Sequence, residues 1–222
     1  MKAETEADQE RREPDYPIVP GAGFHWLTPF YDLLCLPFGL GRRFQRGVAD
    51  RLALTGGERL LDVGCGTGTL LAEVKRRFPG VVGAGIDPDP AILRIAGRRL
   101  ARRGYEVDLQ VARAEALPFP DAAFDVVVST LVLHHLPTPA KHLALGEIFR
   151  TLRPGGRFLL VDFGARPERK VPWWQRLFEN VEHLEDHVQG RLPAFIAQAG
   201  LVNVRCIHRR WPAVEYLAAE KP

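Results

Sequence analysis

Three glycines and two acids form the pattern in this sequence with the clearest chemical meaning. Gly64, Gly66 and Gly68 follow the apolar run 59–63, and residues 69–78 after them have the apolar spacing of a helix. Glycine permits a tight turn between a strand and a helix and lets a ligand touch the backbone. The start of the helix adds free N–H groups and the positive end of its dipole. The pattern predicts a small-molecule site at this turn.

Two acids at strand ends narrow the class of ligand. Asp87 ends the apolar run 81–87, at about the 20-residue offset where an acid binds ribose hydroxyls in dinucleotide sites. Asp62 would repel a pyrophosphate but would hold a cationic amino group. The spacing is Gly-x-Gly-x-Gly, with Thr69 where the dinucleotide fingerprint needs its third glycine. We therefore expect a ligand that has a ribose and lacks a diphosphate.

Alternating elements must position these residues. Strand-like runs occupy 59–63, 81–87, 106–112, 124–130 and 157–163, and helical patterns occupy 69–78, 90–104 and 140–152. Such repeated units with apolar strands predict an α/β fold, Rossmann-like and doubly wound, with a mostly parallel seven-stranded sheet covered on both faces. Two strand-like runs within 201–222 have no helix between them, which predicts an antiparallel C-terminal hairpin at one sheet edge.

Composition excludes several classes of protein. The 222 residues are 46% hydrophobic and 26% charged, as in an ordinary soluble domain, and the net charge of +3 does not by itself indicate nucleic acid or membrane binding. No apolar run approaches the roughly 20 residues that cross a bilayer. Cys35, Cys65 and Cys206 match no disulfide or zinc spacing. A cytoplasmic protein without a metal site is expected.

Two segments interrupt the strand–helix alternation. We expect residues 1–15 to be a disordered tail and residues 16–222 to form a single domain. Residues 16–50 are aromatic-rich, and residues 164–191 separate the fifth strand from the last helix. Both segments can reach the carboxyl edge of a parallel sheet, where ligands bind. We therefore expect them to form a helical lid.

Four ordered motifs resemble a known family: "LLDVGCGTG" (60–68), "GIDPDPAIL" (85–93), "ARAEALPFPDAAFDVVVSTLVLHHL" (112–136) and "EIFRTLRPGGRFLLVDF" (147–163). Together they resemble the class I S-adenosylmethionine-dependent methyltransferases, and most closely the branch of the ubiquinone and menaquinone biosynthesis methyltransferases. The resemblance covers roughly residues 55–165, with a weaker similarity in "FYDLL" (30–34).

The resemblance implies S-adenosylmethionine as the cofactor and assigns roles near its methionine and ribose. Asp62 and the loop of Gly64, Cys65 and Gly66 would face the methionine end. Asp87 would bind both ribose hydroxyls. These roles agree with the independent inference of a ribose and a cationic amino group.

The resemblance also assigns an adenine pocket. Pro88 and Ile92 would lie against the adenine, and Ala114 would present a backbone N–H to the ring with Glu115 beside it. Ser129, at the end of the fourth strand, would contribute backbone near the methionine amino group.

Arg113 departs from the pattern of the family. The family usually has an acid there, which accepts a hydrogen bond from the adenine amino group, and arginine cannot accept one. The contact is therefore lost, made by a neighbour, or replaced by stacking of the guanidinium plane.

Methyl transfer of this kind needs no catalytic triad, because in-line positioning and exclusion of water do most of the work. A base is needed only where the acceptor loses a proton, and His134 or His135 could supply it or merely begin a helix. Tyr31 either covers the cofactor carboxylate or packs in the core.

Three other sets of side chains each have a structural and a functional interpretation. His183 and His187 are spaced to share a helix face, and their acidic neighbours favour a solvated charged face over a metal or acceptor site. Trp173 and Trp174 either line an acceptor pocket or pack a lid. A solvated face, rather than an anionic partner, is the expected role of Arg94, Arg98, Arg99, Arg102 and Arg103.

We expect a methyltransferase for a small, apolar or aromatic acceptor. The alternatives are a macromolecular methyltransferase acting on RNA or protein, and a catalytically silent cofactor-binding protein. The sequence "STLVLHHLP" after the fourth strand lacks an Asn/Asp-Pro-Pro-Tyr-type motif, which disfavours methylation of base amino groups. Arsenite methylation is disfavoured because only Cys35 and Cys206 lie outside the glycine loop.

Overall fold

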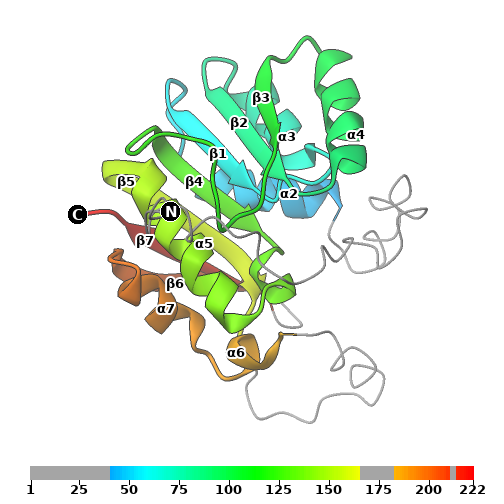
Figure 1. Ribbon diagram of the computed structural model, residues 1–222. Helices are drawn as coiled ribbons and strands as arrows, with labels where there is room; N and C mark the ends of the chain where they lie inside the picture. Colours follow the sequence, from blue (N-terminus) through cyan, green and yellow to red (C-terminus); the bar gives the residue numbers. More distant parts are fainter. Residues whose placement is uncertain (1–40, 166–182, 211–213) are drawn as a thin grey trace, which may run out of the picture.

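A seven-stranded sheet organises the computed structural model, which describes residues 41–165, 183–210 and 214–222 (Figure 1). The strands are β1 (Arg59–Val63), β2 (Val82–Asp87), β3 (Val107–Val111), β4 (Phe124–Thr130), β5 (Leu152–Phe163), β6 (Val202–Arg210) and β7 (Val214–Glu220). The helices are α2 (Arg42–Arg51), α3 (Thr69–Arg77), α4 (Pro90–Ala101), the 3₁₀-helix η3 (Leu133–His135), α5 (Thr138–Thr151), α6 (Glu185–Val188) and α7 (Leu192–Gln198).

The sheet has the strand order β3-β2-β1-β4-β5-β7-β6. The first five strands are parallel, and β7 runs antiparallel to both β5 and β6. The strand order switches between β1 and β4, because β2 and β3 extend the sheet on one side of β1 whereas β4 and β5 extend it on the other. Ligands bind at such a switch point in doubly wound folds. The predicted fold class and the C-terminal edge hairpin are therefore confirmed.

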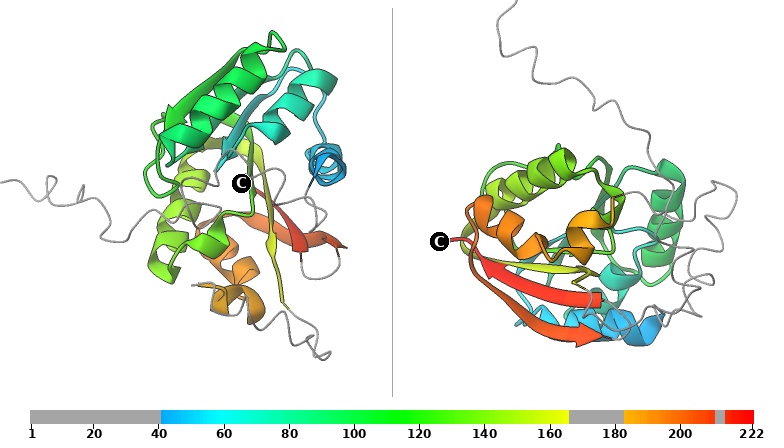
Figure 2. Two further views of the ribbon diagram at one scale, coloured as in Figure 1. Left: turned by 90° about the vertical axis from the view of Figure 1, so that its right-hand side faces the viewer. Right: turned by 90° about the horizontal axis from the view of Figure 1, so that it is seen from below.

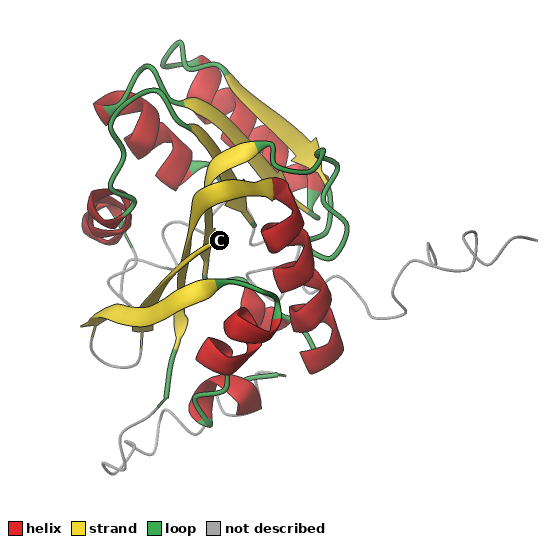
Figure 3. Cartoon of the chain, turned by 90° about the vertical axis from the view of Figure 1, so that its left-hand side faces the viewer, coloured by secondary structure: helices red, strands yellow, loops and turns green. Residues whose placement is uncertain are grey.

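Helices cover both faces of the sheet (Figures 2 and 3). One core contains residues of α2, α3 and α4, including Phe44, Leu71 and Leu93. The other contains residues of α5 and α7, including Leu145, Ile148 and Phe195. The four central parallel strands β1, β2, β4 and β5 contain buried apolar runs because both of their faces are covered. The two edge strands, β3 and β6, contain no fully buried residue.

The fifth strand is longer than predicted. The sequence "RPGG" indicated a break between a helix and a strand beginning at residue 157, but β5 starts at Leu152, directly after α5. Leu152 pairs with Phe124, the register then shifts, and regular pairing resumes between Arg157 and Val126. Gly155 has a φ of +72°, so the glycine absorbs the irregular backbone without ending the strand.

Most of the expected lid lies outside the described residues, including Tyr31, Trp173 and Trp174 and the range 16–40. The described parts of the expected lid are 41–50, 164–165 and 183–191. Of these, residues 42–50 belong to α2, which buries its apolar face. Phe44 and Val48 are buried against α3, and the Phe44 ring contacts the edge of Tyr216, with centroids 6.4 Å apart. The apolar face of this stretch is therefore covered in the described structure, and its role in a lid stays a prediction.

Candidate active site

Three polar residues stand at the carboxyl ends of neighbouring parallel strands. Asp62 lies one residue before the end of β1, Asp87 ends β2, and Ser129 lies near the end of β4. Val63 pairs with Ile86 on one side and with Ser129 on the other. Because paired strands lie about 4.8 Å apart, the structure brings these predicted site residues to one edge.

The glycine loop turns sharply between β1 and α3. Gly64, Gly66 and Gly68 have φ values of +74°, +53° and +69°, in the left-handed region that favours glycine. The backbone N–H groups of Gly64 and Cys65 both donate to the carbonyl of Ile86, at 2.9 and 2.8 Å. The loop is therefore fixed against β2 while its outer surface carries no side chains from the glycines.

Asp87 lies at the carboxyl end of β2, and its side chain also holds the glycine loop by a hydrogen bond. Its Oδ2 accepts from the Gly66 N–H at 3.0 Å, and its Oδ1 accepts from the Asp89 N–H at 3.0 Å. Asp89 in turn caps α4 by accepting from Ala91 N–H at 2.7 Å. A carboxylate has about four acceptor positions, so both oxygens of Asp87 can still accept from the two ribose hydroxyls.

Burial raises the pKa of both strand-end carboxyl groups, Asp62 and Asp87. Desolvation, with a smaller contribution from the charge of Asp87, raises the pKa of Asp62 to about 7. Desolvation also raises the pKa of Asp87 to about 6, although the hydrogen bonds from Asp89 and Gly66 oppose it. A ligand that brings a positive charge to Asp62 would relieve this cost.

Unpaired polar atoms test whether S-adenosylmethionine fits the edge. Among the described residues, buried side-chain atoms there without a hydrogen-bond partner are Asp62 Oδ1, Glu115 Oε1, Ser129 Oγ and Thr130 Oγ1. Buried polar groups normally find partners. A carboxylate oxygen suits an ammonium group, and these atoms lie along the strand ends expected to hold its methionine and adenine. The residues present therefore fit this cofactor.

The remaining predicted cofactor residues surround the same loop. Ile92 and Cys65 are buried, and the Ile92 Cδ1 would lie 4.0 Å from a Cβ added at Gly66. Pro88 is half-buried directly after Asp87, and Ala114 is buried in the loop that follows β3. Apolar side chains are thus placed on the α4 side of the site, where the adenine is expected.

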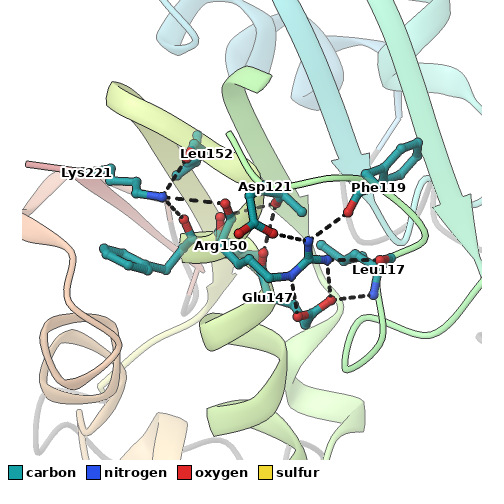
Figure 4. Close-up of polar contacts among 10 residues, drawn as sticks. Leu117, Phe119, Asp121, Glu147, Arg150, Leu152 and Lys221 are labelled. Carbon is teal, nitrogen blue, oxygen red and sulfur yellow. Dashed lines mark hydrogen bonds and ion pairs between the residues drawn. The ribbon is translucent and has the colours of Figure 1, made fainter. Parts of the chain in front are cut away.

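A polar clamp from α5 holds the loop that carries Ala114 (Figure 4). Glu147 Oε2 accepts from the Leu117 N–H at 2.8 Å, and Arg150 donates to the carbonyls of Leu117 at 3.1 Å and Phe119 at 2.8 Å. Arg150 and Glu147 also bind each other in a fork, with two contacts of 2.8 Å. The clamp thus holds one backbone N–H group and two carbonyls of this loop.

Removal of the clamp should weaken cofactor binding without touching the cofactor. In Arg150→Met the stem is kept but the guanidinium is lost, so the loop at 117–121 loses the bonds that restrain it. We expect affinity for S-adenosylmethionine to fall about threefold to tenfold, since mobile binding loops pay an ordering cost. Calorimetry measures this, with Arg153→Met as control because Arg153 is exposed and its ion pair is with Asp125 on β4, not with this loop. Equal loss in both variants would contradict the clamp.

One arginine of the expected solvated face has another role. Arg99 donates through Nη1 to the Thr67 carbonyl at 2.9 Å and to the Thr67 and Thr69 hydroxyls. It therefore ties α4 to the glycine loop, and its expected role as a solvated residue is wrong. Arg94, Arg98, Arg102 and Arg103 are exposed, as expected.

A histidine–carboxylate pair lies at the ends of β4 and β5, beyond the sheet edge that carries Asp62, Asp87 and Ser129. His134 Nδ1 is 2.8 Å from Asp162 Oδ1, and Leu133 N–H donates to Asp162 Oδ2 at 2.9 Å. Burial alone would raise the pKa of Asp162, but the charge and hydrogen bond of His134 lower it to about 2. His135 packs on His134 with ring centroids 3.9 Å apart, and burial lowers its pKa to about 4.

The second histidine pair does not form the solvated helix face that was expected. His183 lies in a turn before the short α6 and is exposed, whereas His187 is wholly buried with Nε2 3.8 Å from Asp162 Oδ1. Asp186 is also buried, because Lys141 Nζ and Thr138 Oγ1 donate to it at 2.8 and 2.7 Å. A buried ion pair to α5 thus turns this face of α6 inward.

Sequence reasoning missed Asp162 and Lys141, and it assigned His187 to a solvated face. Asp162 carried a usable signal, since it is an acid inside the buried run "LLVDF", as Asp62 is inside "LLDV". His187 and Lys141 carried none, because their partners lie far away in the sequence. Within the described residues, no group of three or more His, Cys, Asp or Glu could hold a metal ion. No helix described here is long and apolar enough to cross a membrane.

The two raised pKa values predict how cofactor affinity depends on pH. Asp62 must be ionised to hold an ammonium group, so protonation of Asp62 and Asp87 opposes binding as pH falls through 7 and 6. Cys65 and Glu115 also lie near, and burial raises the pKa of both. We expect the dissociation constant to rise at least tenfold between about pH 7.5 and 5.5. Calorimetry showing a constant value over this range would contradict ionised Asp62 as the amino-group partner.

Comparison with known proteins agrees with this geometry. Residues 60–156 match the family described as a methyltransferase domain. A demethylmenaquinone methyltransferase from Thermus thermophilus is 40% identical over 147 residues, which are 65% of this chain and 66% of that protein. The ubiquinone/menaquinone biosynthesis C-methyltransferase UbiE from Erwinia tasmaniensis is 31% identical over 181 residues, which are 79% of this chain and 68% of that protein.

The fold is also that of solved structures. The S-adenosylmethionine-dependent methyltransferase SibL in its apo form superposes with a TM-score of 0.71 at 20% identity, over 94% of this chain and 64% of that one. Fold and site together define a class I S-adenosylmethionine-dependent methyltransferase. Within that class, the chain belongs to the family related to the UbiE and demethylmenaquinone methyltransferases.

Proposed function

We propose that the protein methylates a ring carbon of a hydroquinone precursor of a quinone. One observation carries this acceptor class: the 40% identity to a protein named demethylmenaquinone methyltransferase. The chain spans about two thirds of that relative's length, 66%, so the acceptor is inferred by similarity. The name of the second relative specifies methylation at carbon, which supports a carbon nucleophile.

The chain's own residues supply binding and orientation. When bound, S-adenosylmethionine supplies an electrophilic methyl group with a neutral leaving group. Asp62 holds the amino group, Asp87 holds the ribose, and the loop after β3 holds the adenine beside Ala114 and Glu115. Rigid attachment of the donor at three points restricts the methyl group to one line of approach, which is the main source of rate in such a transfer.

The acceptor approaches from the ends of β4 and β5. This edge is bordered by Ser129 and Thr130 on the donor side and by His134 and Asp162 beyond them. An electron-rich hydroquinone carbon is nucleophilic enough to attack the methyl group once a ring hydroxyl loses its proton. We place this reaction in the cytoplasm, in one domain spanning 16–222, with no nucleic-acid partner.

A labelling experiment tests this function. The protein is incubated with S-adenosylmethionine carrying a ¹³C-methyl group and with a 1,4-naphthohydroquinone bearing one prenyl unit. We expect the label on a ring carbon, identified by its carbon chemical shift. Label on oxygen, or no transfer to this acceptor while bulk RNA or protein is labelled, would contradict the proposal.

A further inference from the structure

The pair of His134 and Asp162 is more strongly fixed than a helix entry requires. Asp162 is 1% exposed and accepts three hydrogen bonds, from His134 Nδ1 and from the N–H groups of Leu133 and Phe163. The His134 ring is also held edge-on by Phe163, with centroids 4.8 Å apart. The position and rotation of this imidazole are therefore both determined.

The carboxylate also fixes which nitrogen of His134 is basic. Asp162 is ionised, because its pKa is lowered to about 2, so it can only accept hydrogen bonds. The nitrogen facing it, Nδ1, must therefore carry a hydrogen. In the neutral ring Nε2 then has the free lone pair, as in hydrolases where an aspartate orients a histidine base.

The pair lies within reach of the donor site. Ser129 pairs with Leu160, and Asp162 is two residues further along β5. With strands about 4.8 Å apart and residues about 3.3 Å apart, the backbone positions of Ser129 and Asp162 are about 8 Å apart. An acceptor ring bridges such a distance, so one end can meet the methyl group while a hydroxyl meets His134.

Burial, and to a smaller extent neighbouring charged and titratable groups, makes His135 and His187 weak bases. Burial lowers the pKa of His135 and of His187 to about 4, with the neighbouring His134 adding to both shifts. Lys141 on α5 lowers the pKa of His187 further, and His183 that of His135. Both rings are neutral at pH 7, and neither makes a direct hydrogen bond to Asp162 like that of His134.

We propose that His134 is the general base of the methyl transfer, taking the proton of an acceptor hydroxyl, and that Asp162 is its positioning residue. The inference rests on the proposed function. The acceptor O–H bond breaks and its proton moves to His134 Nε2. The electron pair passes through the ring to a carbon, which forms the new C–C bond as the C–S bond breaks. The proton on that carbon then leaves to solvent and the ring becomes aromatic again, while the ring oxygen takes back the proton held by His134.

Two variants test the base while sparing the donor site. In His134→Gln the base is absent, and in Asp162→Asn the side chain keeps its shape but can donate to Nδ1, which favours the wrong tautomer. We expect kcat at about pH 7 to fall 10²- to 10⁴-fold in both, because this is the usual contribution of a positioned base. Affinity for S-adenosylmethionine should stay within about twofold of wild type. His142→Gln, on the exposed side of α5, is the matched control.

The pH profile separates a base from a structural role. Without the base, the rate depends on ionisation of the acceptor itself, so the variants should gain about tenfold per pH unit up to the acceptor's own pKa. They should also recover with acceptors whose hydroxyl is more acidic. Variants that lose rate equally at every pH would overturn the proposal, as would a loss seen in His135→Gln and absent in His134→Gln. If wild type methylates no hydroquinone at all, it is the proposed function that fails.

Discussion

Asp62→Asn should bind S-adenosylmethionine about tenfold to a hundredfold more weakly than wild type and yet unfold at a higher temperature. The affinity falls because a hydrogen bond to a charged group contributes about 1.5–3 kcal/mol, and the amide carries no charge to hold an ammonium. The stability rises because burial raises the pKa of Asp62 to about 7. Above that pH the folded protein without ligand carries a buried charge. Its cost in stability grows as pH rises from the pKa of Asp62 in the unfolded chain to its pKa in the folded protein.

Calorimetry and thermal unfolding at about pH 8 measure the two effects on one sample. Asp108→Asn makes the same chemical change on the exposed surface of β3, where the carboxylate contacts only Gln110 among the bonds described, at 2.8 Å. This control should change neither quantity. If Asp62→Asn unfolds earlier and binds normally, then Asp62 is a structural residue and the amino-group site lies elsewhere.

Gly64→Ala should destabilise the fold more than any other single methyl addition to the glycine loop. A Cβ at Gly64 would lie 2.3 Å from the Val132 Cγ2, and the φ of +74° is itself unfavourable for alanine. The strain costs about 1–2 kcal/mol and the overlap about 1–3 kcal/mol. Together they predict a fall in Tm of roughly 5–15 °C for a domain of this size.

Gly155→Ala separates the two contributions. Gly155 has nearly the same φ, +72°, but a Cβ there meets nothing within 4 Å. The control therefore contains the backbone strain alone and should lower Tm by only a few degrees. Equal falls in both variants would show that Val132 moves aside and that the loop does not pack as closely on the β4 end as described.

The fold followed from the sequence because its signals are local. The apolar runs at β1, β2 and β4 are flanked by helical spacing, and glycine and proline mark most of their ends. The start of β5 was misplaced because pairing with Phe124 holds residue 152 in the sheet despite the following proline and glycines. Sheet pairing is a tertiary effect that no local pattern records.

The residues at the strand ends and in the glycine loop were predictable for the same reason, and the residues that support them from other elements were not. Asp62 and Asp87 lie next to the glycine loop or one strand away, so spacing alone indicates them. The roles of Arg99 and His187 depend on partners 32 and 25 residues away, Thr67 and Asp162. Composition made both residues look solvated, and only packing of α4 and α6 onto the sheet brings them inward.

The central claim is that the strand ends of β1 and β2 form a site for S-adenosylmethionine and not for a dinucleotide. Calorimetric titration of the wild-type protein at about pH 7.5, first with S-adenosylmethionine and then with NAD, tests it most directly. We expect one-to-one binding of S-adenosylmethionine with a dissociation constant in the micromolar range, roughly −8 kcal/mol, and no measurable heat with NAD. Binding of NAD together with no binding of S-adenosylmethionine would contradict it.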